Sequence, residues 1–356
     1  YAALAAATVY LKFNYPKEFF LALLQMSKFE PDPIAEIAKI NRELIHFNIE
    51  LLRPDILKSK EDFCIEGDNI RFGLTSIKGI SNSSIEKLNH FKDCASNKFE
   101  VFQASTEAGI NLGVLSALIQ AGALDMGDKY SRSKVVLECQ LWKVLTPRER
   151  VIALKFAEQG NDDLVNVVNQ MKSKLDENGK RYIKDTRIET MRSKFGPYQK
   201  IYNINHANES FANWYYENEL LGYTHGTPLR SIFLNKNPEL LPIDQVKSAA
   251  TRSKVYFVGT ISDCTGVRTS KNGNEYVKFE VGDEFDSIDV LLFNNKRGNG
   301  IDDCIEYNKG SLPDKKNIVI VTGSKSEDGV FANYVTVQDS KIYMKLGQLR
   351  NDEKNL

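Results

Sequence analysis

The 356-residue sequence lacks the features of several broad classes of protein. It has no run of about 18 apolar residues, so we expect no membrane span. Its first residues, YAALAAATVYLKF, include neither an initiating Met nor the charged start of a signal peptide. Because they read like the inside of a helix, we expect a fragment of a longer cytoplasmic protein. The five cysteines never approach a CxxC spacing, which excludes a zinc ribbon or a disulfide framework and fits a reducing compartment.

The sequence also lacks a recognisable set of catalytic residues. It has no Walker loop and no GxSxG motif, and its four histidines are scattered, with no cysteine or carboxylate at a metal-ligand spacing. Two-metal phosphoryl transfer needs carboxylates held on rigid strands. The pairs Asp162-Asp163 and Asp302-Asp303 are expected in polar loops instead. We therefore predict no catalytic residue and no metal site in this chain.

The formal net charge is zero, which argues against a generally basic nucleic-acid binder. The charge is nevertheless uneven along the chain. Residues 140–200 carry 13 Lys and Arg against 8 Asp and Glu, whereas residues 251–356 carry 15 against 16. Any DNA contact in the last segment must therefore depend on where a few cations lie.

The hydrophobic periodicity predicts an α+β chain of several domains. Residues 1–50 follow a helical pattern with a second helix beginning at Pro16, and residues 73–136 form short helices, one ending at Gly122. Residues 138–215 are helical and polar, with an exposed loop at DENGKRYIKDTR. After Thr251 the period changes to two, which predicts five strands with a polar insert after the third. That order is typical of an OB-fold barrel.

The stretch IKGIS, residues 77–81, is a candidate for a helix-hairpin-helix turn. Such a turn binds a DNA phosphate because its amides and the next helix N-terminus converge on one anion. The usual second glycine is replaced here by Ser81, and Asn82 or Ser83 could cap the following helix. An ordinary structural turn at Gly79 remains the alternative.

The predicted barrel offers a second candidate surface. OB barrels bind single strands with a basic groove and aromatic side chains on which bases stack. Arg268 and Lys271 are expected in the loop between the first two strands. Alternation places Val277, Phe279 and Val281 inside, and leaves Tyr276 and Lys278 on the other face beside Phe293. A protein-binding or purely structural barrel remains the alternative.

Residues 145–160 are superficially similar to the start of a helix-turn-helix DNA-binding motif. Their sequence is LTPRERVIALKFAEQG. Thr146 and Glu149 have the spacing of a capping box, which accounts for the similarity. We predict an amphipathic helix of a linker domain.

Four stretches, in order, resemble the alpha (polymerase) subunit of bacterial replicative DNA polymerase III, a C-family DNA polymerase. The first is similar to the end of the family's fingers segment. It matches at Thr8, Tyr10, Leu11, Lys12, Tyr15, Pro16, Glu18 and Phe19.

The second stretch is similar to the family's Pro-Asp-Ile segment and the hairpin that follows. It matches at Pro54, Asp55, Ile56, Ser59, Phe63, Phe72, Gly73, Leu74, Ile77, Lys78 and Gly79. It departs at Arg53, Leu57 and Ser81. The third is LSALIQAGALD with Arg132 shortly after it, and the fourth is ENELLGYTHGTPL, in which Thr227 rather than His225 precedes Pro228.

The resemblance implies a domain order and a position for the chemistry. The implied domains are residues 1–60 as the end of the fingers, 61–137 as the helix-hairpin-helix region, 138–250 as a helical connector with clamp-binding region, 251–345 as the OB-fold domain and 346–356 as a tail. The catalytic aspartates and their Mg²⁺ would lie upstream of this chain. Partners would be primer-template DNA, single-stranded template, a sliding clamp and other replisome subunits. For the clamp, only QMKSKL at Gln170 approaches the family's peptide, and it lacks the aromatic residue.

The resemblance also implies roles for particular residues. Thr8, Tyr10 and Lys12 would lie near the nucleotide or primer end. Lys78, Gly79, Ile80 and Ser81, with Arg132, would hold duplex phosphates. Arg268, Lys271, Tyr276 and Lys278 would guide single-stranded DNA. The alternative is a non-catalytic single-strand-binding or scaffold module. A ligase fragment is disfavoured because its barrel precedes the hairpins.

Overall fold

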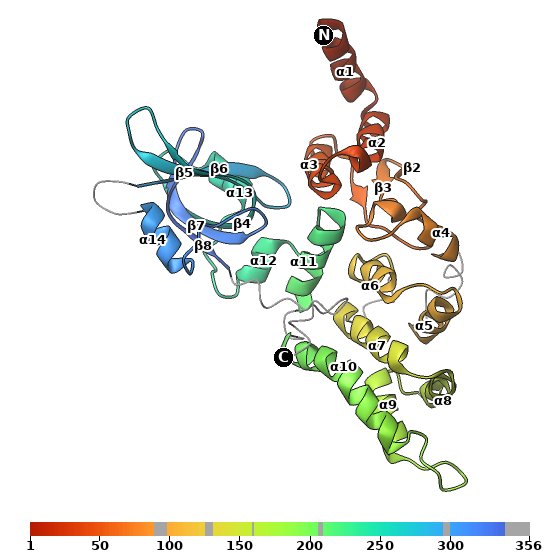
Figure 1. Cartoon of the computed structure of the whole chain (residues 1–356). Helices are drawn as coiled ribbons and strands as arrows, with labels where there is room; N and C mark the ends of the chain where they lie inside the picture. Colours follow the sequence, from red (N-terminus) through yellow and green to blue (C-terminus); the bar gives the residue numbers. More distant parts are fainter. Residues whose placement is uncertain (89–97, 125–130, 159, 206–208, 295–299, 339–356) are drawn as a thin grey trace. The chain divides into compact units, whose positions relative to one another are not determined.

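A computed structural model describes residues 1–88, 98–124, 131–158, 160–205, 209–294 and 300–338 (Figure 1). The chain divides into two compact units, Tyr1–His225 and Gly226–Ile342. The first is mainly helical and the second contains a closed barrel. The α+β fold expected from the sequence is confirmed. Among the described residues, no helix is both long and apolar enough to cross a membrane.

The first unit begins with three helices and a short 3₁₀ turn. They are α1 (Ala2–Asn14), α2 (Pro16–Met26), η1 (Ser27–Phe29) and α3 (Pro33–Ile45). Pro16 and Pro33 occupy first-turn positions, where the missing N–H costs nothing. The Asp32 carboxylate caps α3 by accepting from the Ala35 amide at 3.1 Å. No residue of α1 is buried.

A small sheet connects these helices to the hairpin region. Its strands are β1 (Leu51–Leu52), β2 (Cys64–Glu66) and β3 (Asn69–Arg71), in the order β1-β3-β2. The elements that follow are η2 (Leu74–Ser76), α4 (Asn82–Leu88), α5 (Lys98–Glu107), α6 (Leu112–Gln120) and α7 (Arg132–Val144). The predicted end of a helix at Gly122 is confirmed, since α6 ends at Gln120 and Gly122 has φ +75°.

Four further helices complete the described part of this unit. They are α8 (Pro147–Glu158), α9 (Leu164–Ser173), α10 (Asp185–Asn205) and α11 (Glu209–Leu221). The predicted capping box is confirmed at α8. The Thr146 amide donates to Glu149 Oε2 at 2.7 Å, and the Glu149 amide donates to Thr146 Oγ1 at 3.3 Å. Asp163 caps α9 through the amide of Asn166.

A buried ion pair lies within the helical core. Lys98 Nζ lies 2.7 Å from Glu138 Oε2, and the two side chains are 3% and 0% exposed. Glu138 Oε1 also accepts from the Leu164 amide at 3.0 Å. Burial raises the pKa of Glu138, while Lys98 opposes that shift. The pair therefore joins α5, α7 and the start of α9 in one arrangement, since removing either partner would leave a buried charge alone.

The second unit is an OB-fold barrel, as predicted. It contains α12 (Leu229–Phe233), α13 (Ile243–Ser248), α14 (Gly300–Tyr307) and the strands β4 (Lys254–Thr269), β5 (Glu275–Gly282), β6 (Ser287–Phe293), β7 (Ile318–Lys325) and β8 (Gly329–Val337). The strand order is β4-β5-β6-β8-β7, and β6 pairs with β8 in parallel. The insert after the third strand forms α14. Asp302 and Asp303 lie in its first turn, and the expected loop for these residues was wrong.

The first barrel strand is longer than its sequence suggests. We expected it to end near Asp263, but β4 continues to Thr269 through two irregularities, at Ile261/Asp263 and Cys264/Val267. Such bulges bend a strand and let it pair on both sides around a small barrel. The expected alternation in β5 is confirmed, because Val277, Phe279 and Val281 are fully buried.

Candidate nucleic-acid interface

The hairpin turn keeps some of its amides free. Ile77 and Ile80 are buried, and the Ile80 amide donates to the Ile77 carbonyl at 3.1 Å. The Lys78 amide donates to the Leu220 carbonyl at 3.1 Å. The amides of Gly79 and Ser81 donate to no residue in the described part of the chain. Two of the four candidate amides are therefore available to an anion, and two are already used inside the protein.

Gly79 has the backbone geometry expected of such a turn. Its φ is +91°, and a Cβ at this position would meet no atom within 4 Å. The turn is thus open towards solvent at Gly79. The Ser81 hydroxyl lies 2.9 Å from that of Ser83 and 3.2 Å from that of Ser84. These hydroxyls lie beside the first turn of α4, where an oxyanion would be favoured.

The Lys78 side chain is about half exposed and forms an ion pair with Glu219 on α11. A duplex phosphate would compete with a carboxylate for this ammonium group. Because exposed ion pairs contribute little to stability, exchange of Glu219 for phosphate costs little.

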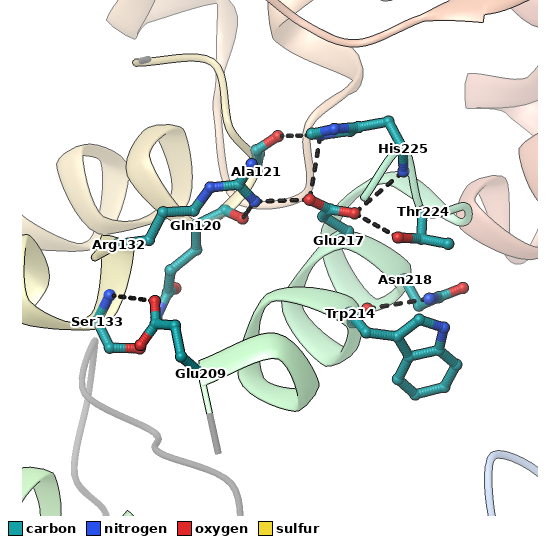
Figure 2. Close-up of polar contacts among 10 residues, drawn as sticks. All are labelled: Gln120, Ala121, Arg132, Ser133, Glu209, Trp214, Glu217, Asn218, Thr224 and His225. Carbon is teal, nitrogen blue, oxygen red and sulfur yellow. Dashed lines mark hydrogen bonds and ion pairs between the residues drawn. The ribbon is translucent and has the colours of Figure 1, made fainter. Parts of the chain in front are cut away.

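Arg132 lies in a different environment from the one expected. Arg132 Nη1 lies 2.6 Å from Glu217 Oε1 and 3.3 Å from the Gln120 carbonyl (Figure 2). Its side chain is 22% exposed, and that of Glu217 is 1% exposed. Arg132 therefore joins α7 to α11 and the end of α6. The structure does not bring Arg132 together with the hairpin turn in any hydrogen bond that it records.

Glu217 also holds the segment that follows α11. Its Oε2 accepts from the His225 amide at 3.0 Å and from the Thr224 hydroxyl (Figure 2). Burial would raise the pKa of Glu217, but His225 and Arg132, with the hydrogen bond from Thr224, outweigh it and hold the pKa below its usual value. The carboxylate is thus stabilised as a buried anion.

The His225 ring completes this cluster. Its Nε2 lies 3.1 Å from the Ala121 carbonyl and 3.3 Å from Glu217 Oε1. Both neighbours are acceptors, so Nε2 carries the proton. Burial lowers the pKa of His225, with Glu217 opposing the shift. The ring therefore donates from Nε2 and ties residue 121 to residue 217.

The predicted residues of α1 lie outside the hairpin turn. The Thr8 hydroxyl donates to the Leu4 carbonyl of its own helix at 2.9 Å, and Tyr10 is 58% exposed. Lys12 Nζ lies 2.5 Å from Glu43 Oε2 and within 6 Å of the centres of the Phe20 and Phe47 rings. Lys12 therefore fastens α1 to α3, whereas Thr8 and Tyr10 face away from the core.

The barrel brings its predicted residues closer together. Arg268 pairs with Tyr276 in register, and Tyr276 pairs with Phe293. The expected loop position of Arg268 was wrong, because the bulged β4 carries it into the sheet; Lys271 lies in the turn that follows. Lys278 Nζ lies 2.7 Å from Asp289 Oδ2, and this hydrogen bond raises the pKa of Lys278.

An aromatic row crosses three strands on the outer face of the barrel. The ring centres of Tyr276 and Phe293 lie 5.7 Å apart, and those of Phe293 and Phe331 lie 5.8 Å apart. Phe331 is 47% exposed. Sequence reasoning missed Phe331, although the alternation of β8 could have shown it, since neighbouring Val330 is fully buried. Tyr276 and Phe293 are partly buried beside Phe331. Aromatic side chains grouped in this way are of the kind on which bases stack.

Within the described ranges, no group of three or more His, Cys, Asp or Glu could hold a metal ion. The hairpin turn offers free amides to a phosphate, and the barrel offers aromatic rings to bases.

Comparisons with known proteins agree with the motif assignment. Residues 48–135 match the family model described as a helix-hairpin-helix motif. DNA polymerase III subunit alpha of Thermus aquaticus is 27% identical over 82% of this chain, and that of Aquifex aeolicus is 25% identical over 92%. The same subunit of Deinococcus radiodurans is 31% identical over 35% of the chain.

The chain spans only part of these proteins, covering 22% of the Thermus aquaticus subunit, 23% of the Aquifex aeolicus subunit and 9% of the Deinococcus radiodurans subunit. The resemblance expected from the four sequence motifs is nevertheless confirmed, and the chain is similar over most of its length to the alpha subunit of DNA polymerase III.

Proposed function

We propose that this chain is the DNA-holding portion of a replicative DNA-directed DNA polymerase. The turn at Lys78–Ser81 holds duplex phosphates, and the barrel holds single-stranded template. The catalytic aspartates and their Mg²⁺ lie outside residues 1–356, and the intact protein is a cytoplasmic nucleotidyltransferase. A sliding clamp and other replisome subunits are its expected partners.

The aromatic row on the barrel is the observation that carries this proposal. Tyr276, Phe293 and Phe331 form a stacking surface beside Arg268, and Lys271 follows in the next turn. Base stacking on an aromatic ring tolerates any sequence, as a template-holding surface must. The nearby cations are few, so stacking rather than bulk charge provides the contact.

Single-strand binding by the full chain tests the role of the barrel. Tyr276→Ala and Phe331→Ala should each weaken binding of a labelled single-stranded oligonucleotide by about 1–3 kcal/mol, roughly 5- to 150-fold. Tyr334→Ala is the matched control, because Tyr334 is 56% exposed on the same strand but contacts Tyr307 outside the row. Equal losses in all three variants would contradict the assignment.

Duplex binding tests the role of the hairpin. Lys78→Ala should lower affinity for a blunt duplex and leave single-strand binding nearly unchanged, and duplex affinity should fall as salt rises. Loss of both activities to the same degree would count against separate sites. The chain alone should add no nucleotide to a primer in the presence of Mg²⁺. Incorporation by the purified chain would show that its active site lies within it.

The alternative function is a non-catalytic module that binds single strands or serves as a replisome scaffold. Such a module would use the same hairpin turn and the same aromatic row on the barrel. Sequencing the gene upstream of Tyr1 separates the two, because only the polymerase requires catalytic aspartates encoded there.

A further inference from the structure

A local excess of positive charge lies at the end of α9 and the start of α10. Residues 171–200 carry nine Lys and Arg against four Asp and Glu, in a chain of zero net charge. They include the end of α9, residues 174–184 and the first part of α10. We define the α9–α10 basic surface as Lys172, Lys174, Lys180, Arg181, Lys184 and Arg192.

The connection between the two helices has a defined shape. The Asp176 carboxylate accepts from the amides of Asn178 at 2.9 Å and Lys180 at 2.8 Å. The Asp176 amide in turn donates to the Lys180 carbonyl at 2.7 Å, and Leu175 forms a bridge with Arg181. Asp176 is thus occupied in shaping the turn. Lys174, Lys180 and Lys184 are exposed on and around it.

Few of these cations are neutralised. Arg181 pairs with Asp185, and Arg192 lies 2.8 Å from Glu189, both as exposed pairs of the kind that contribute little. Within the described residues, the four lysines form no ion pair. Lys172 Nζ contacts only an amide oxygen, that of Asn169 at 3.3 Å. The surface therefore presents more positive charge than its carboxylates can offset.

Two cations of this surface lie on different helices. Lys172 lies on α9 and Arg192 on α10, and burial together with the charge of Arg192 lowers the pKa of Lys172. An anion beside Lys172 would offset part of the cost of holding a partly buried ammonium group near a second cation.

The aromatic side chains of this region exclude a stacking surface. Phe195 is buried, and Tyr182 packs edge-on against Phe156 at 5.5 Å. Among the described residues 171–200, Leu175 is the one large apolar side chain that is well exposed. A ligand here would meet ammonium and guanidinium groups without a ring on which to stack. That chemistry fits the regular phosphates of a duplex backbone.

We propose that the α9–α10 basic surface binds the phosphodiester backbone of duplex DNA, as a contact additional to the hairpin turn. This inference rests on the proposed DNA-holding function. Its contacts are electrostatic and independent of base sequence. It gives residues 171–200 a role that neither the hairpin nor the barrel provides.

Replacement of three unpaired lysines tests this inference in the full chain. Lys172→Gln/Lys180→Gln/Lys184→Gln should raise the Kd for a blunt duplex of about 20 base pairs at least tenfold near 0.1 M salt. The slope of log K against log salt should fall in magnitude by about 2–3, as expected for two or three lost phosphate contacts. Fluorescence anisotropy measures both.

Matched variants separate charge from structure. Lys172→Arg/Lys180→Arg/Lys184→Arg keeps the charge and should bind duplex like the original chain. Single-strand affinity should be the same in both triple variants, because the aromatic row is untouched. An unchanged Kd and salt slope in the glutamine variant would overturn the inference. Reduced binding of poly-glutamate with unchanged duplex binding would overturn it in favour of an acidic protein partner.

The two proposals can fail separately. If Lys78→Ala still lowers duplex binding while the glutamine variant does not, the inference about α9–α10 fails alone. If Lys78→Ala and Tyr276→Ala change neither duplex nor single-strand binding, the proposed function fails, whatever the glutamine variant shows.

Discussion

Tyr223 packs its ring into the core of the first unit. Its ring stacks on Phe72 with centres 5.9 Å apart, and 6% of the residue is exposed. Its hydroxyl is buried without a hydrogen-bond partner among the described residues. Burial raises its pKa well above the usual value, so the group stays neutral. A buried hydroxyl without a partner costs free energy, since it gives up its hydrogen bonds to water.

We therefore expect Tyr223→Phe to keep or raise the free energy of unfolding, by up to about 1 kcal/mol. Tyr223→Ala should lower it by about 3–5 kcal/mol, because the ring itself fills the core. Urea unfolding followed by circular dichroism measures both. A clear loss of stability in Tyr223→Phe would show that the hydroxyl has a partner after all.

His225 gives the fold a pH dependence. Its folded pKa is lowered by burial, so the folded state binds fewer protons than the unfolded state as pH falls below about 6.5. Stability is therefore fully present above that pH and is lost as pH falls through the lowered folded pKa. The pKa of Glu217 is also lowered, and its contribution is lost in a more acidic range, below about pH 4.3.

The variant His225→Gln tests this assignment. Glutamine can still donate to the Ala121 carbonyl, but it does not titrate. The fall in unfolding free energy between about pH 6.5 and 5 should become shallower in this variant than in the original chain. Equilibrium unfolding at several pH values provides the comparison. An unchanged slope would assign the pH dependence to another group.

At this scale the sequence predicts residue types better than their partners. It pointed to Lys78 and Arg132 through family motifs, and to Tyr276 through alternation. It could not show that Lys78 pairs with a residue 141 positions away, or that Arg132 and His225 share Glu217. Such pairs are fixed by helix packing, which a local pattern does not encode. The DNA roles of these residues remain predictions.

At the scale of elements, the segment after α11 explains why the motifs occur together. Glu219 and Leu220 contact Lys78 of the second motif, and Glu217 contacts Arg132 after the third. Tyr223 stacks on Phe72, also of the second motif. The stretch Glu217–His225 is thus a clasp that joins the hairpin region to α6 and α7. The residues of this clasp are therefore needed for contacts inside the protein.

Two glycines at turns test whether the clasp is closely packed. Gly222 has φ +84°, and a Cβ there would meet the Ile34 backbone oxygen at 2.4 Å. Gly79 also has positive φ, but its Cβ position is open. Gly222→Ala should lower the free energy of unfolding by about 2–4 kcal/mol, because strain and a backbone clash add. Gly79→Ala should cost about 1 kcal/mol from strain alone. Equal effects in thermal unfolding would contradict the close approach of Gly222 to α3.

Strands and helices were predictable where one period was sustained. The five barrel strands, the start of α2 at Pro16 and the cap at Thr146 follow from local patterns. The extension of β4 did not, because Ser-Asp-Cys-Thr-Gly at 262–266 has the composition of a turn. There the pairing with β5 on one side decides the structure, and tertiary contacts override local preference.

The whole molecule has two separate hydrophobic cores. One is formed by residues from α2 to the clasp, and the other by the barrel strands with α13 and α14. The sequence indicated the barrel through its change of period. It gave no sign that α12 and α13 belong to the same compact unit, since their short helical patterns do not show which core Ile243 and Val246 enter. The domain boundaries implied by family resemblance remain predictions.

Separate cores predict separate unfolding. Phe279 and Phe102 are both fully buried, the first in the barrel and the second in the helical core. Each Phe→Ala substitution should cost about 3–5 kcal/mol in its own unit. Scanning calorimetry of the full chain should then show two transitions, with Phe279→Ala lowering one and Phe102→Ala the other. Single-strand binding should be lost with the barrel transition, because Tyr276, Phe293 and Phe331 are held by its strands. One transition shifted equally by both variants would mean that the cores fold as a single cooperative unit.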